Sequence, residues 1–246
     1  MTKKTQYDVI GRRYAEMKEN AAFCVADSYT LLDALRACGD LRGRPALDVA
    51  CGHGDISRLL AGRGAAPVIG VDVSAEMVRL ARALERQDPR GIQYLVADAA
   101  ELPVLGSFAV ATASYLFNYA PTRAVKRAMF TAVRANLAPD GTLLAVVPNT
   151  GPFLEEAGAT GARLVERVPG GEAPLMRMEF LSDPPVPFAY YEWQRADYEQ
   201  AAREAGFGTV RWQSTRTPPP DERWSTAFWA DYQQAPRSSL MICRQP

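Results

Sequence analysis

The sequence predicts an α/β fold in which a mostly parallel sheet is covered by helices on both faces. Short apolar runs alternate with stretches of helical periodicity, and each run is almost continuously apolar. A strand has this composition when neither of its faces meets water, as in a parallel sheet between two layers of helices. The apolar runs cover residues 45–50, 67–73, 92–98, 108–117 and 141–148.

Helical structure is expected before the first of these strands. One helix is predicted over about Tyr7 to Asn20, and a second contains Leu31, Leu32 and Leu35 at helical spacing. The chain therefore begins with helices and enters the sheet only after about residue 40.

The alternation of strands and helices ends after residue 148. The irregular stretch 149–184 is too long for a plain connection, so it either carries its own structure or shapes a binding site. No crossover helix is expected between the last two strands, which should therefore pair antiparallel at a sheet edge. The elements predicted here are strands near 162–169, 174–181 and 185–193, a helix over 195–205, and final strands at 208–214 and 238–244.

The charge balance favours a small molecule over nucleic acid or a membrane as the partner. Lys and Arg number 28 among 246 residues, as do Asp and Glu, so no excess positive charge attracts nucleic acid or anionic lipid. The sequence shows no signal-peptide pattern and no membrane-spanning apolar run, so a cytoplasmic protein is expected. The four cysteines lack metal-binding or disulfide spacing, and no metal site is predicted. A homo-oligomer is left open.

The first predicted strand runs into a glycine turn that is suited to a ligand. Gly52 and Gly54 allow a tight turn and let backbone N–H groups approach a ligand at the start of the next helix. A dinucleotide fingerprint would need a third glycine, but Ser57 stands at that position, and Ala50 replaces an earlier glycine. This weakens the prediction of a nicotinamide dinucleotide site without excluding it.

Three acidic residues lie at the ends of three successive predicted strands. Asp48 is in the first strand, Asp72 ends the second and Asp98 ends the third. Ligands of open parallel sheets bind outside these strand ends, and an acid after the second strand can accept hydrogen bonds from both ribose hydroxyls of an adenosine. Asp98 is placed to accept a hydrogen bond from an adenine amino group. Ser74 is placed to cap the following helix, which leaves Asp72 for the ligand.

These segments resemble those of class I S-adenosylmethionine-dependent methyltransferases. The resemblance rests on LDVACGHG (47–54), GVDVSAEMVRLA (70–81), YLVADAAELP (94–103) and FAVATASYLFNYA (108–120). It implies a Rossmann-like sheet of seven strands with an antiparallel C-terminal hairpin, an N-terminal helical lid, and S-adenosylmethionine as cofactor, with S-adenosylhomocysteine as product. The segments 7–18 and 191–207 also resemble small-molecule methyltransferases of specialised metabolism, of the toxoflavin N-methyltransferase type.

The resemblance also implies the organisation of the chain and the cofactor-binding residues. We expect one domain, with residues 1–40 as the lid, 41–148 as the cofactor-binding core and 149–246 as a substrate-shaping insertion with the last strands. The methionine half of the cofactor would be held by Asp48 and the turn Ala50, Cys51, Gly52, His53 and Gly54. Asp72 would bind the ribose, and the adenine would meet Val73, Met77, Asp98 and Ala99. Ser114 and Tyr115 would line the methyl-transfer channel, and Tyr7 and Tyr14 would belong to the lid.

Methyl transfer from a sulfonium depends mainly on positioning, so no strong catalytic base is required. Tyr14 and Asn118 are the candidate catalytic residues. His53, the single histidine, has a suitable unperturbed pKa for a base. Because it lies between two turn glycines, a structural or cofactor-side hydrogen bond is favoured for it.

The acceptor is predicted to be a small aromatic or heterocyclic metabolite, because aromatic residues are frequent in the segments expected around the site. Strand alternation puts Tyr190 and Glu192 on one face and Tyr191 and Trp193 on the other. The sequence does not choose among N, O and C methylation. The alternatives are an NAD(P)-dependent oxidoreductase and a non-catalytic sensor of an adenosine ligand. The candidate acceptor-binding residues are Phe117, Asn118, Tyr119, Glu179, Tyr190 and Trp193.

Overall fold

The computed structural model describes the chain except for residues 1–4, 10, 12–20 and 152–160. Most of the helix predicted over Tyr7 to Asn20, including Tyr14, therefore lies outside the described residues.

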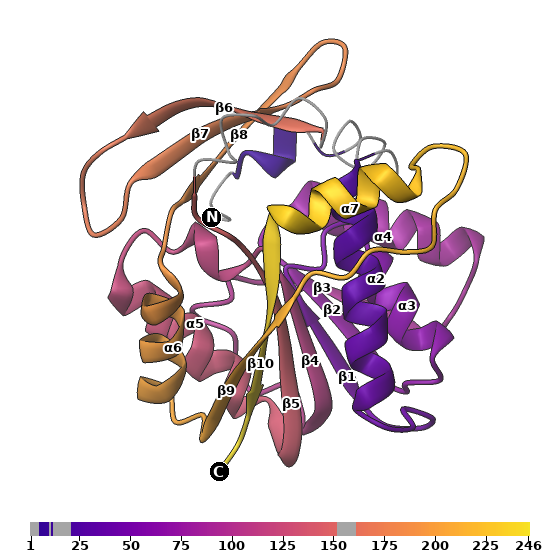
Figure 1. Ribbon diagram of the computed structural model, residues 1–246. Helices are drawn as coiled ribbons and strands as arrows, with labels where there is room; N and C mark the ends of the chain where they lie inside the picture. Colours follow the sequence, from indigo (N-terminus) through magenta and orange to yellow (C-terminus); the bar gives the residue numbers. More distant parts are fainter. Residues whose placement is uncertain (1–4, 10, 12–20, 152–160) are drawn as a thin grey trace.

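Seven strands form the central sheet, in the order β3-β2-β1-β4-β5-β10-β9 (Figure 1). Strands β1 to β5 run parallel to one another, whereas β10 runs antiparallel to both β5 and β9. The strand order reverses at β1, which pairs with β2 on one side and β4 on the other, so the ends of β1 and β4 flank the expected ligand site. This topology confirms the predicted sheet. The strands are β1 (Ala46–Val49), β2 (Val68–Asp72), β3 (Ile92–Val96), β4 (Phe108–Ser114), β5 (Leu137–Pro148), β9 (Thr209–Ser214) and β10 (Ser238–Arg244).

Helices cover both faces of this sheet, as predicted. On β5, Leu143 and Ala145 pack in the core cluster that contains α5 and α6, whereas Leu144 and Val146 pack in the cluster that contains α2, α3 and α4. Successive residues of a strand point to opposite faces, so one apolar run serves two cores. Of the described helices, none is long and apolar enough to cross a membrane. The helices are α2 (Ala22–Ala37), α3 (Asp55–Gly62), α4 (Ala75–Gln87), α5 (Arg123–Ala135), α6 (Arg195–Glu204) and α7 (Thr226–Gln234), with a short 3-10 helix η1 (Phe117–Tyr119).

The helix α7 corrects one expectation. No helix was expected between the last two strands, yet α7 lies there, capped by the Ser225 hydroxyl, which accepts a hydrogen bond from the Phe228 N–H. Trp229 and Tyr232 bury their rings against Ala26 of α2 and its neighbours. The helix exists because it covers this part of α2, a long-range contact that its own sequence does not reveal. The predicted antiparallel pairing of β9 and β10 is nevertheless confirmed.

A second sheet lies across the end of the first (Figure 1). Its strands β6 (Ala162–Val168), β7 (Leu175–Phe180) and β8 (Val186–Tyr191) form an antiparallel meander in the order β6-β7-β8. They correspond to the three strands predicted after residue 148. The segment between β5 and α6 thus carries its own structure.

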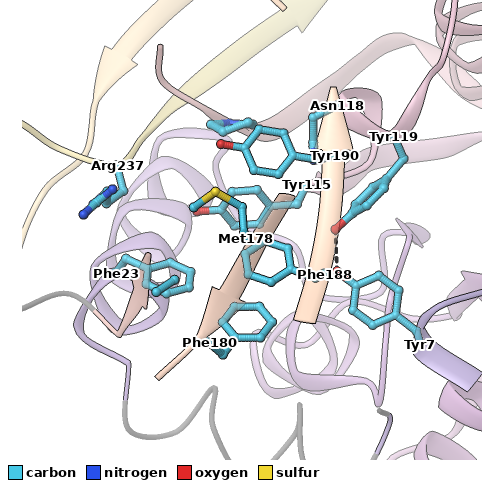
Figure 2. Close-up of a pocket in the computed structure, with 12 residues that line it drawn as sticks. Tyr7, Phe23, Tyr115, Asn118, Tyr119, Met178, Phe180, Phe188, Tyr190 and Arg237 are labelled. Carbon is cyan, nitrogen blue, oxygen red and sulfur yellow. Dashed lines mark hydrogen bonds between the residues drawn. The ribbon is translucent and has the colours of Figure 1, made fainter. Parts of the chain in front are cut away.

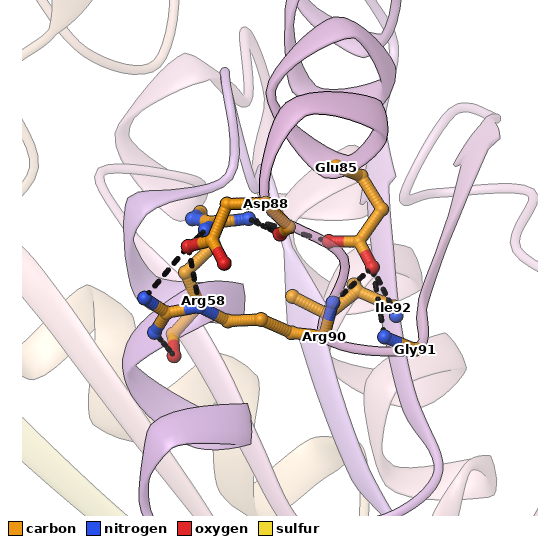
Figure 3. Close-up of polar contacts among 6 residues, drawn as sticks. All are labelled: Arg58, Glu85, Asp88, Arg90, Gly91 and Ile92. Carbon is orange, nitrogen blue, oxygen red and sulfur yellow. Dashed lines mark hydrogen bonds and ion pairs between the residues drawn. The ribbon is translucent and has the colours of Figure 1, made fainter.

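The opposite end of the sheet is held by a polar cluster between α3, α4 and β3 (Figure 3). The Glu85 carboxylate accepts hydrogen bonds from the backbone N–H groups of Arg90, Gly91 and Ile92 at 2.6, 2.8 and 3.1 Å. Arg58 of α3 forms ion pairs with Glu85 and Asp88. These contacts fix the connection between α4 and β3, and therefore the position of the carboxyl end of β3.

Candidate functional site

The turn after β1 uses left-handed backbone conformations at three positions. Ala50, Gly52 and Gly54 have φ values of 61°, 55° and 101°. The Gly52 N–H donates a 2.8 Å hydrogen bond to the Asp72 carboxylate, which ties the turn to the end of β2. Ala50 adopts a conformation that costs an ordinary residue energy, as is common where a backbone is shaped for a ligand.

Gly54 is needed because the Tyr94 ring fills the space beside it. A Cβ atom on Gly54 would lie 2.4 Å from the Tyr94 hydroxyl oxygen, and the same ring packs against Gly70. A Cβ on Gly52 would meet no atom within 4 Å. We expect Gly54→Ala to lower the thermal unfolding midpoint by several degrees more than Gly52→Ala, because only the first adds a clash to the backbone strain. Equal midpoints for the two variants would contradict this reading of the turn.

Asp72 is a buried carboxylate at the end of β2. Its side chain is 9% exposed, and its second oxygen accepts a 2.8 Å hydrogen bond from the Ser74 N–H. Ser74 caps α4 by accepting a hydrogen bond from the Met77 N–H and donates its own hydroxyl proton to Asp8. The capping role is therefore filled by Ser74, as predicted. Asp72 connects the turn after β1, through Gly52, with the start of α4, through Ser74.

A cavity opens beside this turn, and we call it the strand-end cavity. It lies among the ends of β1, β2 and β4 and the first turns of α2. Two carboxylates, Asp27 and Asp72, are among the described residues that line it. The lining comprises Tyr7, Cys24, Asp27, Ser28, Ala50, Cys51, Gly52, Ile56, Asp72, Met77, Ser114, Tyr115 and Tyr119.

A second cavity, which we call the aromatic cavity, lies beneath the sheet β6-β7-β8 (Figure 2). The rings of Phe180 and Phe188 stack with centroids 4.0 Å apart, and Phe23 lies parallel to Phe180. The cavity is therefore shaped by flat apolar surfaces, which suit a planar ligand. Its lining comprises Tyr7, Phe23, Tyr115, Asn118, Tyr119, Pro148, Ala162, Met178, Phe180, Phe188, Tyr190 and Arg237.

Three tyrosines belong to the linings of both cavities. They are Tyr7, Tyr115 and Tyr119. The hydroxyls of Tyr7 and Tyr119 form a hydrogen bond with each other, and their rings meet edge to face. Tyr115 has a left-handed backbone with φ 54°. The two cavities thus adjoin at a wall of hydroxyl-bearing rings.

The tyrosine hydroxyls around the site are protonated at neutral pH. Burial raises the pKa of Tyr115, Tyr119 and Tyr190 above the ordinary value, and the Asp27 carboxylate adds to the rise at Tyr115. These groups can donate hydrogen bonds, but they are poor bases.

Asp27 is a site residue that the sequence analysis missed. Its carboxylate accepts hydrogen bonds from Tyr115, at 2.5 Å, and from Ser238 of β10. The available signal was its spacing, because Asp27 precedes Leu31 and Ala34 on the buried stripe of α2. A carboxylate on such a stripe requires partners, and here they join α2, β4 and β10.

Eight of the predicted cofactor-binding residues line the strand-end cavity. They are Tyr7, Ala50, Cys51, Gly52, Asp72, Met77, Ser114 and Tyr115.

The other described candidates do not belong to that lining. Asp48 lies within β1, where its two carboxylate oxygens accept hydrogen bonds from Ser57 and Thr112 at 2.7 and 2.8 Å. His53 is buried, with Nε2 2.8 Å from Asp55, so the structural role favoured for it fits its position.

The remaining three residues of the adenine side and Gly54 also lie off the lining. Asp98 is exposed and accepts a hydrogen bond from the Ala100 N–H at 2.9 Å, while Ala99 packs into the main core. Val73 is half-buried just before α4. Gly54 precedes α3, where the Tyr94 ring covers it.

The acceptor-binding candidates divide in the same way. Asn118, Tyr119 and Tyr190 line the aromatic cavity. Phe117 is fully buried and stacks on Phe130 in the core.

Two further acceptor candidates, Glu179 and Trp193, do not line the aromatic cavity. Glu179 pairs with Arg163 across the neighbouring strand, so it points away from the cavity that Met178 and Phe180 line. Trp193 is buried in the main core, where its indole N–H donates to the Ala120 carbonyl at 3.0 Å.

The alternation of β7 could have identified the cavity-lining residues. Met178 and Phe180 flank Glu179 in sequence and share the opposite face of the strand. Because Glu179 was predicted to bind the acceptor, Met178 and Phe180 on the opposite face were not predicted to do so. Phe23 and Arg237 carried no comparable signal, because α2 and the start of β10 meet β7 only in the folded chain.

Comparisons with known proteins agree with this geometry. The family model described as a methyltransferase domain matches residues 46–141. The ubiquinone biosynthesis O-methyltransferase of Xanthomonas campestris pv. campestris is 31% identical over 141 residues, which cover 56% of this chain and 56% of the relative. The chain thus matches about half the length of this curated relative.

Solved methyltransferase structures share the fold. An S-adenosylmethionine-dependent methyltransferase from Clostridium acetobutylicum superposes with a TM-score of 0.64 at 14% identity, with 90% of each chain covered. The magnesium protoporphyrin IX methyltransferase from Synechocystis, solved with bound S-adenosylhomocysteine, gives 0.58 at 21% identity, covering 90% of this chain and 82% of that one. Residues 46–141 therefore match a methyltransferase domain, and the chain shares its fold with S-adenosylmethionine-dependent methyltransferases.

Proposed function

We propose that this protein transfers the methyl group of S-adenosylmethionine to a small aromatic or heterocyclic acceptor, in specialised-metabolite biosynthesis. One observation carries the proposal: the strand-end cavity and the aromatic cavity meet at the wall formed by Tyr7, Tyr115 and Tyr119. A donor in one cavity and a planar acceptor in the other would face each other across this wall. The curated relatives support a small-molecule acceptor, since the name of one places it in ubiquinone biosynthesis.

The strand-end cavity fits the cofactor in its chemistry. Asp72 would accept hydrogen bonds from the ribose hydroxyls, and Met77 supplies an apolar surface for the adenine. The turn from Ala50 to Gly52 lets the backbone approach the methionine half closely, since open space surrounds the Cα of Gly52. The cofactor would supply an electrophilic methyl group on a positively charged sulfur.

The residues of the site act by positioning. In the proposed transfer, the acceptor's lone pair would form the bond to the methyl carbon while the electron pair of the carbon–sulfur bond stays on sulfur. The acceptor's proton would be lost to solvent when the product leaves. The aromatic surfaces of Phe180 and Phe188 hold the ring and exclude water, and the tyrosine hydroxyls donate hydrogen bonds. Correct alignment alone can supply about 7 to 11 kcal/mol of a barrier in favourable intramolecular models.

Calorimetry with S-adenosylhomocysteine and with NAD tests the cofactor assignment. We expect micromolar-range binding of S-adenosylhomocysteine and no measurable binding of NAD, because the turn lacks the third glycine of a dinucleotide site. Binding of NAD alone would replace the proposal with the oxidoreductase alternative.

Transfer of labelled methyl groups to a panel of aromatic metabolites tests the activity itself. We expect label in at least one hydroxylated or amino-substituted ring compound. If S-adenosylhomocysteine binds and no acceptor is labelled, the sensor alternative is favoured instead.

A further inference from the structure

The aromatic cavity contains few polar groups, and they differ in kind. Apart from the tyrosine hydroxyls, its described lining has one amide, Asn118, and one guanidinium, Arg237. No carboxylate belongs to this described lining. Asn118 and Arg237 are therefore the polar groups of the described lining, besides the hydroxyls, that an acceptor in this cavity would meet.

Arg237 brings a positive charge to the edge of an apolar cavity. It directly precedes β10, and its backbone carbonyl accepts a 2.9 Å hydrogen bond from the Asn149 N–H, just after β5. Figure 2 shows Arg237 at the side of the cavity toward which the Tyr190 hydroxyl points. Burial lowers the pKa of the guanidinium, but the group keeps its charge at neutral pH.

A partly desolvated guanidinium is a strong site for an anion. Its charge is less screened by water than that of a surface arginine, and its planar fork matches a carboxylate. The strand-end cavity, in contrast, carries the two carboxylates Asp27 and Asp72. An anionic ligand is thus favoured in the aromatic cavity and disfavoured in its neighbour.

Asn118 offers a buried hydrogen-bond acceptor. Its side chain is 2% exposed, it lines the aromatic cavity, and its Oδ1 atom has no hydrogen-bond partner among the described residues. Buried polar atoms are nearly always paired, so an unpaired one in a cavity lining indicates a group supplied by the ligand. That group must be a donor, an N–H or O–H.

From these contacts we infer that the acceptor is an aromatic ring carrying an anionic substituent, bound by Arg237, and an N–H or O–H donor, received by Asn118. The inference rests on the proposed function and names its acceptor class, of which hydroxy- and amino-substituted aromatic carboxylates are the simplest members. Two fixed points on a planar ring also set its rotation within the cavity. They therefore determine which ring position faces the wall of tyrosines.

Matched ligand pairs test the inference on the wild-type protein. With the protein saturated with S-adenosylhomocysteine, calorimetry would compare the three hydroxybenzoates and the three aminobenzoates with the corresponding benzamides. We expect at least one carboxylate to bind ten-fold or more tightly than its amide. Equal affinities across all pairs, or no measurable affinity for any carboxylate, would overturn the inference.

Variants then assign the preference to residues. Arg237→Gln should abolish the carboxylate preference, whereas Arg211→Gln on the exposed face of β9 should leave it unchanged. Asn118→Leu, similar in size, should abolish the preference for a hydroxybenzoate over its methoxy analogue. A preference that survives both site substitutions overturns the assignment.

Neither site variant should change the affinity for S-adenosylhomocysteine, because Arg237 and Asn118 do not line the strand-end cavity. This control distinguishes the two proposals. If the wild-type protein does not bind S-adenosylhomocysteine, the proposed function is contradicted. If it binds S-adenosylhomocysteine but methylates only uncharged aromatic rings, only the inferred acceptor class is contradicted.

Discussion

The Asp72→Ala variant is expected to bind S-adenosylhomocysteine about 100-fold more weakly than the wild-type protein. Hydrogen bonds to a charged group contribute roughly 1.5–3 kcal/mol each, so the loss of two ribose contacts corresponds to at least this factor. The substitution also removes the acceptor for the Gly52 N–H, which loosens the turn beside the cavity. Isothermal titration calorimetry measures the change directly.

Asp98→Ala is the matched control, because Asp98 is the acid at the end of the neighbouring strand and is exposed. We expect a clearly smaller loss there than for Asp72→Ala, because Asp98 does not line the strand-end cavity. Thermal unfolding of both variants separates local changes from loss of the fold. Unchanged affinity in a folded Asp72→Ala variant would refute the ribose assignment.

The Lys126→Met variant is expected to be more stable than the wild-type protein, by about 4 kcal/mol at neutral pH. Lys126 of α5 is fully buried, and its Nζ atom has no hydrogen-bond partner among the described residues. It lies 3.6 Å from the ring centroid of Trp193 and 4.0 Å from that of Tyr198. Desolvation lowers the pKa of Lys126 from 10.5 to about 6, although the nearby Asp197 carboxylate favours the ammonium.

The pH dependence of this difference is the sharper test. Below about pH 6 the lysine is protonated in both states, and the full cost of burying the charge is present. Between pH 6 and 10.5 only the unfolded chain binds the proton, so the wild-type free energy of unfolding rises relative to that of the variant, by up to ~1.4 kcal/mol per pH unit. The advantage of Lys126→Met should therefore shrink as the pH rises.

Urea unfolding between pH 6.5 and 9.5 measures this trend. Arg127→Met, one residue further along the same helix but exposed, is the control and should show a difference that does not vary with pH. A constant advantage of Lys126→Met over this range would mean that the lysine stays charged when folded.

The fold was largely predictable because its strongest signals are local. Apolar runs marked β1 to β5, and the three strands of the second sheet appeared as short extended segments even though their place in the fold did not. The helix α7 was not predicted because Trp229 and Tyr232 gain their stability from burial against α2, more than 200 residues earlier in the chain.

The candidate site was predictable where the backbone determines it. Asp72 and the turn at Gly52 follow from the position of strand ends, and both line the strand-end cavity. Arg237 could not be identified, because its position depends on which distant elements meet. The spacing of Asp27 indicates burial, but not the partners that it finds at the end of β4 and on β10. Trp193 follows the end of β8 and packs into the main core, where the sequence pattern predicted a strand that continues to residue 193.

Among the described residues, the second sheet, β6-β7-β8, contributes to only one of the two cavities. The described lining of the aromatic cavity draws five residues from β6, β7 and β8, namely Ala162, Met178, Phe180, Phe188 and Tyr190, whereas the described lining of the strand-end cavity draws none. Under the proposed function, substitutions in this meander would change the acceptor-binding cavity and leave the described lining of the donor cavity unchanged. Exchanging the meander between related chains would then change which acceptor is methylated.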